Sequence, residues 1–401
     1  MQQERKHTCH VLLIYHHMIP SIRLCGHCQM EYLARKGRIE YRAITETKLR
    51  SNDLKWADIV LLGRLDSWYA YHLTQRLYTA QKYLVYIIDD DLLNIPPEIS
   101  SAAYYGKKET RDHIIGMIEM SNAILSPSPR LLDKYALDGH EAIPIEEAAI
   151  DPVSYKPHAL DEPVKIGFAG SIDRTSDLES ILKDALLRIK NTYKERVQFE
   201  FLGAIPSFAQ AVGANCLPYL SSYDEYRRTL NCLDWDIGLA PMPETSFHAC
   251  KHYNKFIEYA AAGIMGVFSE TEPYTRLKMM NAPAAFSRND AASWYETLRY
   301  YIDHPQEKET YRRRCVEMAQ TQFSVAHSAS VLMEVAGNVL VPCATKREVT
   351  GLCIVRIGWC GHRALEKCRK YGIRLPYVAL EKIAKQLRKK HLTGNRISKQ
   401  N

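Results

Sequence analysis

The sequence has no long run of apolar residues. No stretch approaches the roughly 18 uninterrupted apolar residues that a membrane-spanning helix needs. The first ten residues, MQQERKHTCH, also lack the apolar core of a signal peptide. We therefore expect a cytoplasmic protein whose 11 cysteines are reduced thiols rather than a disulfide framework.

Internal repeats are missing as well. No self-similarity recurs at a period of roughly 20–50 residues, which argues against a solenoid or a propeller. The composition, 46% apolar and 25% charged residues, is ordinary for a globular protein. A length of 401 residues therefore suits two compact domains, each with its own core.

The net charge of +7 is distributed unevenly along the chain. Residues 346–401 hold 15 Lys and Arg against 3 Glu, whereas the rest holds 38 basic and 43 acidic residues. A mildly acidic body thus carries a strongly basic C-terminal segment, and the two parts need separate explanations.

Short apolar runs rich in β-branched residues alternate with longer segments of helical periodicity. The expected strands are residues 10–15, 39–44, 57–63, 83–89, 123–126 and 141–145, then 164–170, 197–203, 235–240 and 266–269. The expected helices include residues 27–36, 69–80, 110–120 and 130–135, then 178–193, 223–231, 254–262 and 291–303. This alternation predicts an α/β protein with parallel sheets covered by helices on both faces.

The alternation is interrupted once, by three prolines within the 13 residues 151–163. Such a stretch is typical of an interdomain connection. We therefore expect a Rossmann-like domain over residues 1–150, a linker over 151–163, a second Rossmann-like domain over 164–345, and a basic helical tail over 346–401.

The most informative motif lies where an expected strand is followed by a loop and a helix. Lys251, Asn254 and Lys255 come just before or at the start of that helix, and Glu258 lies one turn further on. Lysines are unfavourable at a helix N-terminus unless an anion binds there too, shared with the helix N–H groups. The pattern therefore predicts an anion site, with Glu258 accepting hydrogen bonds from a ribose; the alternative is that both lysines are merely solvated.

This stretch resembles the C-terminal signature of group 1, family 4-type glycosyltransferases of the GT-B fold. Glu258 matches the second glutamate of that family's glutamate-x7-glutamate motif, whereas Cys250 stands where the first is usual. The resemblance, to a divergent branch, implies two domains facing across a cleft, a nucleotide-sugar donor, retention of anomeric configuration, and no metal or other cofactor.

Two glycine-containing turns agree with the resemblance. Gly170 and Ser171, with Arg174 just beyond, are similar to the family's turn beneath the donor diphosphate, and Gly26 follows the first strand in the same way. Glycines let backbone N–H groups approach phosphate closely. We expect all four residues, with Lys251, Asn254, Lys255 and Glu258, to bind the donor.

Polar residues at strand ends of the first domain predict the acceptor side. Asp89 and Asp90 fall where many family members carry a catalytic histidine-aspartate pair, and either could orient the acceptor hydroxyl or take its proton. Lys255 would assist catalysis by stabilising the diphosphate leaving group. His16 and Arg64 are further acceptor-side candidates. The alternative for each aspartate is a hydrogen-bonded turn that caps a helix.

The sequence CGHC over residues 25–28 has the spacing of a disulfide-exchange site. The chain lacks a thioredoxin-like domain around it, so we interpret it as the first strand–helix turn. We also expect no metal at Cys25, His27 and Cys28, because no second paired cluster completes a zinc site.

The basic tail permits three interpretations. An apolar stripe containing Leu380 and Leu387, flanked by Lys382 and Lys389, suits an anionic membrane surface. Nucleic-acid binding and a solvated helix packed on the body are the alternatives. We expect a membrane contact at the inner face of the plasma membrane, and no nucleic-acid partner.

Together these patterns predict a glycosyltransferase that moves a sugar from a nucleotide sugar to a saccharide or lipid-linked acceptor, in the biosynthesis of cell-surface polysaccharide or glycoconjugates. Two alternatives stay open. One is a nucleotide-sugar epimerase or hydrolase of the same fold, and the other is a binding module that has lost catalysis.

Overall fold

The computed structural model describes residues 8–341, 348–352, 355–356, 358–360, 362–363 and 366. The basic stretch expected to form an amphipathic helix, residues 377–390, lies outside the described residues, so the expected membrane contact stays a prediction. Among the described helices, none combines the length and the apolar character needed to cross a membrane.

The N-terminal lobe is built on a six-stranded parallel sheet with the order β2-β1-β3-β4-β5-β6. Its strands are β1 (Cys9–Tyr15), β2 (Ile39–Thr45), β3 (Ile59–Gly63), β4 (Tyr83–Ile87), β5 (Ala123–Ser126) and β6 (Glu141–Pro144). Its helices are α1 (Pro20–Ile22), α2 (Cys28–Arg35), α3 (Ser51–Trp56), α4 (Trp68–Thr79), α5 (Ala102–Tyr105), α6 (Lys108–Glu119) and α7 (Pro129–Tyr135).

Strand β1 shows why the central strands contain consecutive apolar residues. Leu12 and Ile14 enter one hydrophobic core, whereas Val11 and Leu13 enter the core on the opposite face of the sheet. Successive strand side chains point to opposite faces, and helices cover both faces here. A continuous apolar run is therefore the expected sequence of such a strand.

The C-terminal lobe repeats this design with the strand order β12-β11-β10-β7-β8-β9, again all parallel. Its strands are β7 (Val164–Gly170), β8 (Val197–Gly203), β9 (Asn215–Leu217), β10 (Ile237–Ala240), β11 (Met265–Ser269) and β12 (Ala284–Ser287). Its helices are α8 (Thr175–Asp177), α9 (Lys183–Tyr193), α10 (Tyr223–Leu233), α11 (Ser246–Ala249), α12 (Asn254–Ala261), α13 (Arg276–Met279), α14 (Ala291–Asp303) and α15 (Pro305–Gln320).

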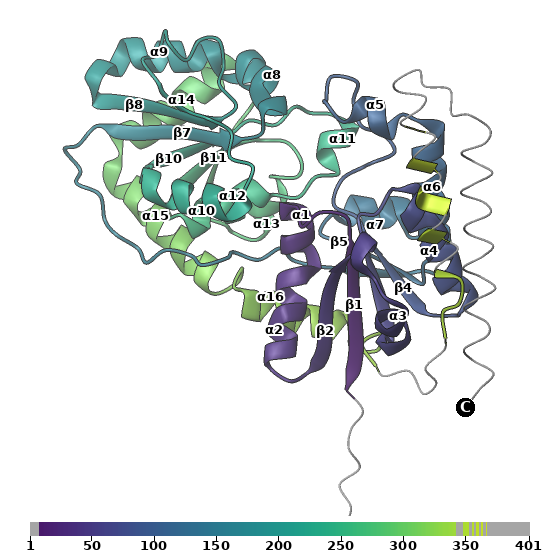
Figure 1. Cartoon of the computed structure of the whole chain (residues 1–401). Coiled ribbons are helices and arrows are strands. Elements are labelled where there is room, and N and C mark those ends of the chain that lie inside the picture. The colour runs from purple at the N-terminus through teal and green to yellow at the C-terminus, as the bar shows by residue number, and fades with distance from the viewer. Residues whose placement is uncertain are drawn as a thin grey trace, which may run out of the picture.

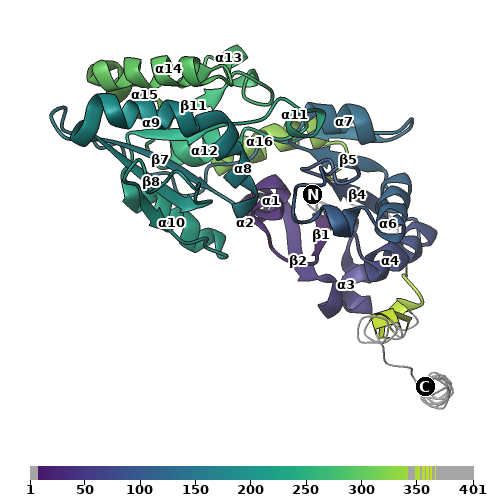
Figure 2. The same cartoon turned by 90° about the horizontal axis from the view of Figure 1, so that it is seen from above.

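The predicted architecture of two doubly wound sheets is confirmed, and Figures 1 and 2 show the two lobes side by side. Two strands escaped the sequence analysis, β9 and β12. Both are short and lie at an outer edge of the C-terminal sheet, where little apolar pattern is needed to bury them.

Helix α16 (Val325–Ala336) departs from the expected domain boundaries. It follows the C-terminal lobe in the chain but lies beside α2 of the N-terminal lobe (Figure 1). Ala329 and Leu332 are fully buried in the N-terminal core, and Ser328 accepts a hydrogen bond of 3.0 Å from Gln29. The chain therefore crosses between the lobes twice, and α16 packs on the N-terminal lobe.

The described part of the tail also packs on the N-terminal lobe. Val349, Leu352 and Val355 are buried in its core, and the ring of His362 stacks on Trp68 with centroids 5.4 Å apart. Beyond α16 the chain thus continues along the N-terminal lobe.

Candidate active site

A cleft of about 500 Å³ opens between the two lobes, beyond the carboxyl ends of both sheets. This is the edge at which open α/β sheets bind ligands. Both lobes line it, and ten of the predicted site residues lie there: Arg64, Asp89 and Asp90 from the N-terminal lobe, and Gly170, Ser171, Arg174, Lys251, Asn254, Lys255 and Glu258 from the C-terminal lobe.

Lys255 and Glu258 occupy the first turns of α12. The Lys255 Nζ lies 2.6 Å from Glu258 Oε2, and the Tyr226 hydroxyl donates to the same oxygen at 2.9 Å. Lys255 also contacts the Tyr226 hydroxyl at 3.1 Å. Lys255, Glu258 and Tyr226 thus form a compact triad in which the lysine pairs with the glutamate, so an anion bound there would have to share this lysine.

Lys251 connects the two lobes. Its Nζ lies 2.7 Å from Asp90 Oδ1, and Arg64 reaches Asp90 Oδ2 at 3.3 Å and Asp89 Oδ1 at 2.9 Å. Burial opposes ionisation of Asp90, but Lys251 and Arg64 prevail and hold its pKa below the ordinary value. Lys251 of the C-terminal lobe thus meets a cluster of Arg64, Asp89 and Asp90 from the N-terminal lobe across the cleft.

The glycine turn at the end of β7 is part of the C-terminal wall of the cleft. A Cβ on Gly170 would lie 2.7 Å from the Phe168 ring, so packing alone already requires a glycine there. Arg174 contacts Asp177 at 3.0 Å through Nε and donates to the backbone oxygen of Pro241. The guanidinium is therefore held against the cleft wall by fixed partners.

Two predicted site residues, Gly26 and His16, are absent from the residues lining the cleft. Gly26 has a φ of +123°, which explains the glycine, but its N–H donates to the Gln29 side chain at 3.0 Å. That N–H is already used, so a phosphate contact at Gly26 is not available in this arrangement. His16 pairs instead with the buried Glu46 at 2.7 Å.

Cys250, which stands where the resembled family has its first glutamate, is buried in the hydrophobic core of the N-terminal lobe. Burial raises the pKa of its thiol, and Asp91 adds to the shift. This position therefore joins the lobes by packing and is not among the residues that line the cleft.

The two thiols of the CGHC stretch are buried, as that of Cys250 is. Cys25 is fully buried and Cys28 nearly so, and burial raises the pKa of the Cys28 thiol to about 12. Thiolates carry out disulfide exchange, so such thiols do not suit it. The interpretation of this stretch as the first strand–helix turn is wrong in its position, because β1 ends at Tyr15, α1 begins at Pro20, and residues 25–28 occupy the kink between α1 and the start of α2.

Glu147 is a cleft residue that the sequence analysis missed. It is 1% exposed, and neither carboxylate oxygen has a hydrogen-bond partner among the described residues. Burial raises its pKa well above the ordinary value, and the nearby Asp89, Glu146 and Glu258 add to the shift. It follows β6 within an irregular stretch, so no local pattern could have singled it out.

His248 on α11 is a second missed residue. Its ring lines the cleft, and burial lowers its pKa to about 4, with Arg174 and Lys251 contributing. It is therefore neutral at physiological pH. Its only sequence signal is the position in the loop before the lysine motif.

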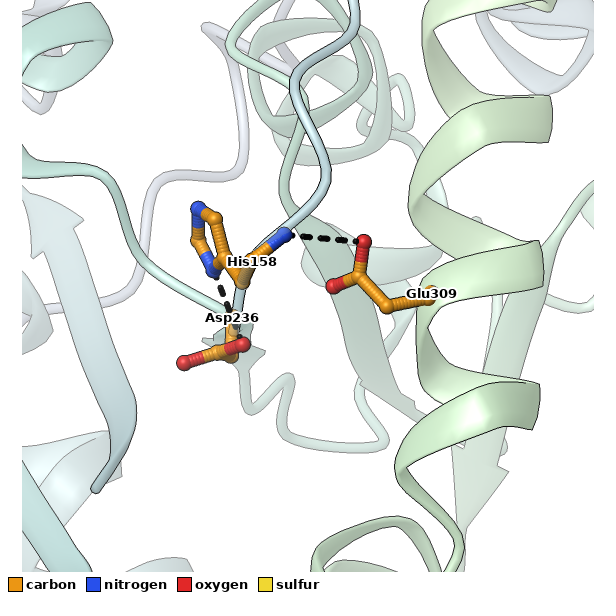
Figure 3. Close-up of side chains that lie close together, drawn as sticks. All are labelled: His158, Asp236 and Glu309. Carbon is orange, nitrogen blue, oxygen red and sulfur yellow. Dashed lines mark hydrogen bonds and ion pairs between the residues drawn. The ribbon is translucent and has the colours of Figure 1, made fainter. Parts of the chain in front are cut away.

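A dense charged cluster, which we call the brace, lies at the opposite edge of the C-terminal sheet. His158, Asp236 and Glu309 approach one another as metal ligands might (Figure 3). However, Lys308 lies 2.7 Å from Asp236, and Arg312 lies 2.6 Å from Glu309. These two buried cations already neutralise both carboxylates, so the brace is complete without a metal.

No family model matches the chain, and no curated protein matches it by sequence. Solved structures do match its shape. A protein from Listeria monocytogenes, assigned as a UDP-N-acetylglucosamine 2-epimerase, superimposes with a TM-score of 0.51 at 10% identity, over 84% of this chain and 100% of its own. HepE from Anabaena, in complex with UDP and glucose, gives 0.56 at 12% identity over 82% and 98%. A glycosyltransferase from Rickettsia africae gives 0.53 at 14% identity over 82% and 99%.

The chain has the GT-B fold. The superpositions span both lobes, and the two facing parallel sheets agree with that assignment. At these identities the match concerns the fold alone, because one fold hosts many activities. In GT-B terms, the C-terminal lobe carries the lysine motif, and the N-terminal lobe carries Asp89 and Asp90.

Proposed function

We propose that this chain is a nucleotide-sugar-dependent glycosyltransferase. The observation that carries the proposal is the interlobe cleft, in which Arg174, Lys251 and Lys255 gather on the C-terminal wall within reach of the α12 N-terminus. Fixed cations and helix N–H groups stabilise a departing diphosphate most strongly in a closed, water-poor site. HepE of Anabaena, with a similar fold, is described in complex with UDP-glucose, which supports UDP-sugars as the first donors to test.

On the N-terminal side, Asp89 and Asp90 would meet the acceptor. Arg64 and Lys251 keep Asp90 ionised, which suits a group that accepts a proton or a hydrogen bond from a hydroxyl. A saccharide or lipid-linked acceptor, and a role in making cell-surface polysaccharide, remain part of the proposal. The excess of basic residues over 346–401 supports an anionic membrane surface as the place of reaction.

A second candidate is a nucleotide-sugar epimerase. Cys250 is buried in the N-terminal core at the position where the resembled glycosyltransferases carry an acid near the transferred sugar. The cleft instead offers Glu147 and Asp177 from other elements. The similar fold of the Listeria protein assigned as a 2-epimerase supports the same alternative.

Two measurements test the proposal. Thermal unfolding is followed first with UDP, GDP and their sugars, since a ligand at a hundredfold excess over Kd stabilises the native state by about 2.7 kcal/mol. Products are then analysed with and without saccharide and lipid-linked acceptors. Transfer only with acceptor supports a glycosyltransferase, whereas conversion of donor alone identifies an epimerase or hydrolase. A folded protein that no nucleotide stabilises would overturn both candidates.

A further inference from the structure

His248 lies in the C-terminal wall of the cleft, within electrostatic reach of two cations. It is 7% exposed and lines the cleft together with Arg174 and Lys251. Only its Nδ1 has a hydrogen-bond partner among the described residues, the Thr245 hydroxyl at 2.8 Å. Its Nε2 is left for a ligand, whereas Arg174 and Lys251 already contact Asp177 and Asp90.

The contact with Thr245 bears on the tautomer of the ring. The Thr245 oxygen accepts a hydrogen bond of 3.2 Å from the backbone N–H of His248 and caps α11. Its hydroxyl lies 2.8 Å from Nδ1 of His248 and either donates to this nitrogen or accepts from it, depending on the tautomer. Where the hydroxyl donates, Nδ1 is the acceptor and the single proton of the neutral imidazole lies on Nε2.

The charges around the ring keep it neutral. Burial, Arg174 and Lys251 all lower its pKa, and Asp90 across the cleft only partly opposes them. An imidazolium would add a third positive charge beside two cations, whereas the neutral ring offers a directed N–H at no such cost. A ligand with negatively charged oxygens therefore meets two cations and a neutral donor.

We propose that the Nε2–H of His248 donates a hydrogen bond to the diphosphate of the bound nucleotide sugar, and that Thr245 is the positioning residue that holds this tautomer. The inference rests on the proposed function for the identity of the ligand. Phosphate oxygens fit because they accept hydrogen bonds strongly and would draw the flanking Arg174 and Lys251 toward the same group. A β-phosphate beside His248 would also place the attached sugar toward Asp90.

The test compares variants at both positions of the full-length protein. His248→Leu removes the donor, and we expect UDP to bind roughly tenfold or more weakly, since a hydrogen bond to a charged group is involved. His248→Gln places an amide N–H at a similar reach and should restore part of that loss. Thr245→Val should weaken UDP binding by a smaller factor, whereas Thr245→Ser should not. Binding of UMP, which lacks the β-phosphate, is the control and should change little in every variant.

Nitrogen NMR of labelled histidine checks the tautomer without any ligand. The expected result is a proton on Nε2 and none on Nδ1 down to about pH 5, and a shift of the proton toward Nδ1 in Thr245→Val. A proton on Nδ1, or UDP affinity unchanged in a folded His248→Leu, would overturn the inference while leaving the proposed function intact. If the wild-type protein binds neither UDP nor any nucleotide sugar, the proposed function fails and this inference fails with it.

Discussion

The brace and the cleft both contain buried charged groups, the brace within the C-terminal lobe and the cleft between the two lobes. In the brace, Asp236 has Lys308 at 2.7 Å and also accepts the backbone N–H of Lys165 at 2.8 Å. In the cleft, Glu147 is as deeply buried but has no partner among the described residues. Two similarly buried carboxylates thus differ in their partners, because Asp236 is paired and Glu147 is unpaired among the described residues.

The pairing of buried polar groups distinguishes a cluster that stabilises the fold from a site that binds a ligand. Buried polar groups that are fully paired fix the fold, whereas an unpaired one costs free energy in every native molecule. Such a cost persists at sites where a ligand supplies the missing partner. Loss of a contact in the brace should therefore lower stability without affecting binding, whereas loss of an unpaired carboxylate in the cleft should raise stability, and loss of a cleft cation should weaken binding.

The largest expected effect is the loss of stability in Lys308→Met. It leaves Asp236 buried without its cation, and removing one partner of a buried ion pair typically costs about 3–5 kcal/mol. Denaturant unfolding measures the loss, and UDP affinity measured on the remaining folded protein should not change. Asp236→Asn in the Lys308→Met background should recover part of the stability, because it removes the uncompensated charge.

The brace also predicts a dependence of stability on pH. His158 and Lys308 overcome the opposing effect of burial and lower the pKa of Asp236 to about 2. A carboxyl whose native pKa is depressed stabilises the fold above its unfolded pKa of about 3.9, and this contribution disappears as the pH falls toward 2. Asp236→Asn should flatten the acid limb of a stability–pH curve measured between pH 5 and 2. An unchanged limb would show that the brace does not govern acid stability.

Lys255→Met tests the other side of the comparison. Lys255 is the cation of the α12 triad, and we expect UDP to bind more weakly by about 2 kcal/mol, roughly thirtyfold, as for charge-assisted hydrogen bonds. Stability should change by less than about 1 kcal/mol, because Tyr226 still donates to Glu258. Lys278→Met, which removes an exposed lysine paired with Glu270, is the matched control and should leave UDP affinity unchanged.

The lysine motif could be predicted from the sequence because its signal is local. A strand, a loop and the start of a helix place Lys251, Asn254 and Lys255 near one another whatever the rest of the chain does. Asp89 and Asp90 were found for the same reason, since they directly follow a strand. The two-lobe fold was also predictable, because every buried strand must repeat the same apolar pattern.

Residues whose role depends on distant partners could not be predicted. Glu147 is exceptional only because nothing in the folded chain pairs with it, and His248 because Arg174 and Lys251 surround it. The sequence predicted a phosphate contact at Gly26, but in the folded chain its N–H donates to the side chain of Gln29. Helix α16 shows an amphipathic pattern, but no pattern states which lobe will bury it.

Replacing Glu147 should raise stability. A buried carboxyl without a partner costs about 1–3 kcal/mol, so Glu147→Leu should stabilise the ligand-free protein by about 1–2 kcal/mol if the site tolerates the side chain. Its raised native pKa means that the folded state binds the proton more tightly than the unfolded state. Stability therefore falls as the pH rises above the ordinary carboxyl pKa of about 4.3.

Glu147→Gln provides the second measurement for the same residue. The amide cannot ionise, so this variant should lose the decrease in stability between pH 5 and 8 while keeping a polar group of the same size. Denaturant midpoints across that range are sufficient to detect the change. A Glu147→Leu protein that is less stable than the wild type, with the pH slope retained, would mean that the carboxyl has a partner in solution and that the contrast with the brace is wrong.

The smallest effect is expected at an exposed pair between the lobes. Arg23 lies 2.7 Å from Asp224, and their side chains are 30% and 48% exposed. Arg23 lowers the pKa of Asp224, but water and salt screen such pairs, which contribute about 0–1 kcal/mol. Asp224→Asn should therefore change stability by less than about 0.5 kcal/mol, and by nothing measurable in 1 M salt. The two ions of this pair lie as close as Lys308 and Asp236, 2.7 Å, but are far less buried, and Asp224 also has Arg227 at 3.4 Å. A loss comparable to that of Lys308→Met would show that contact distance, rather than burial, sets the strength of these pairs, and the contrast between brace and surface would no longer hold.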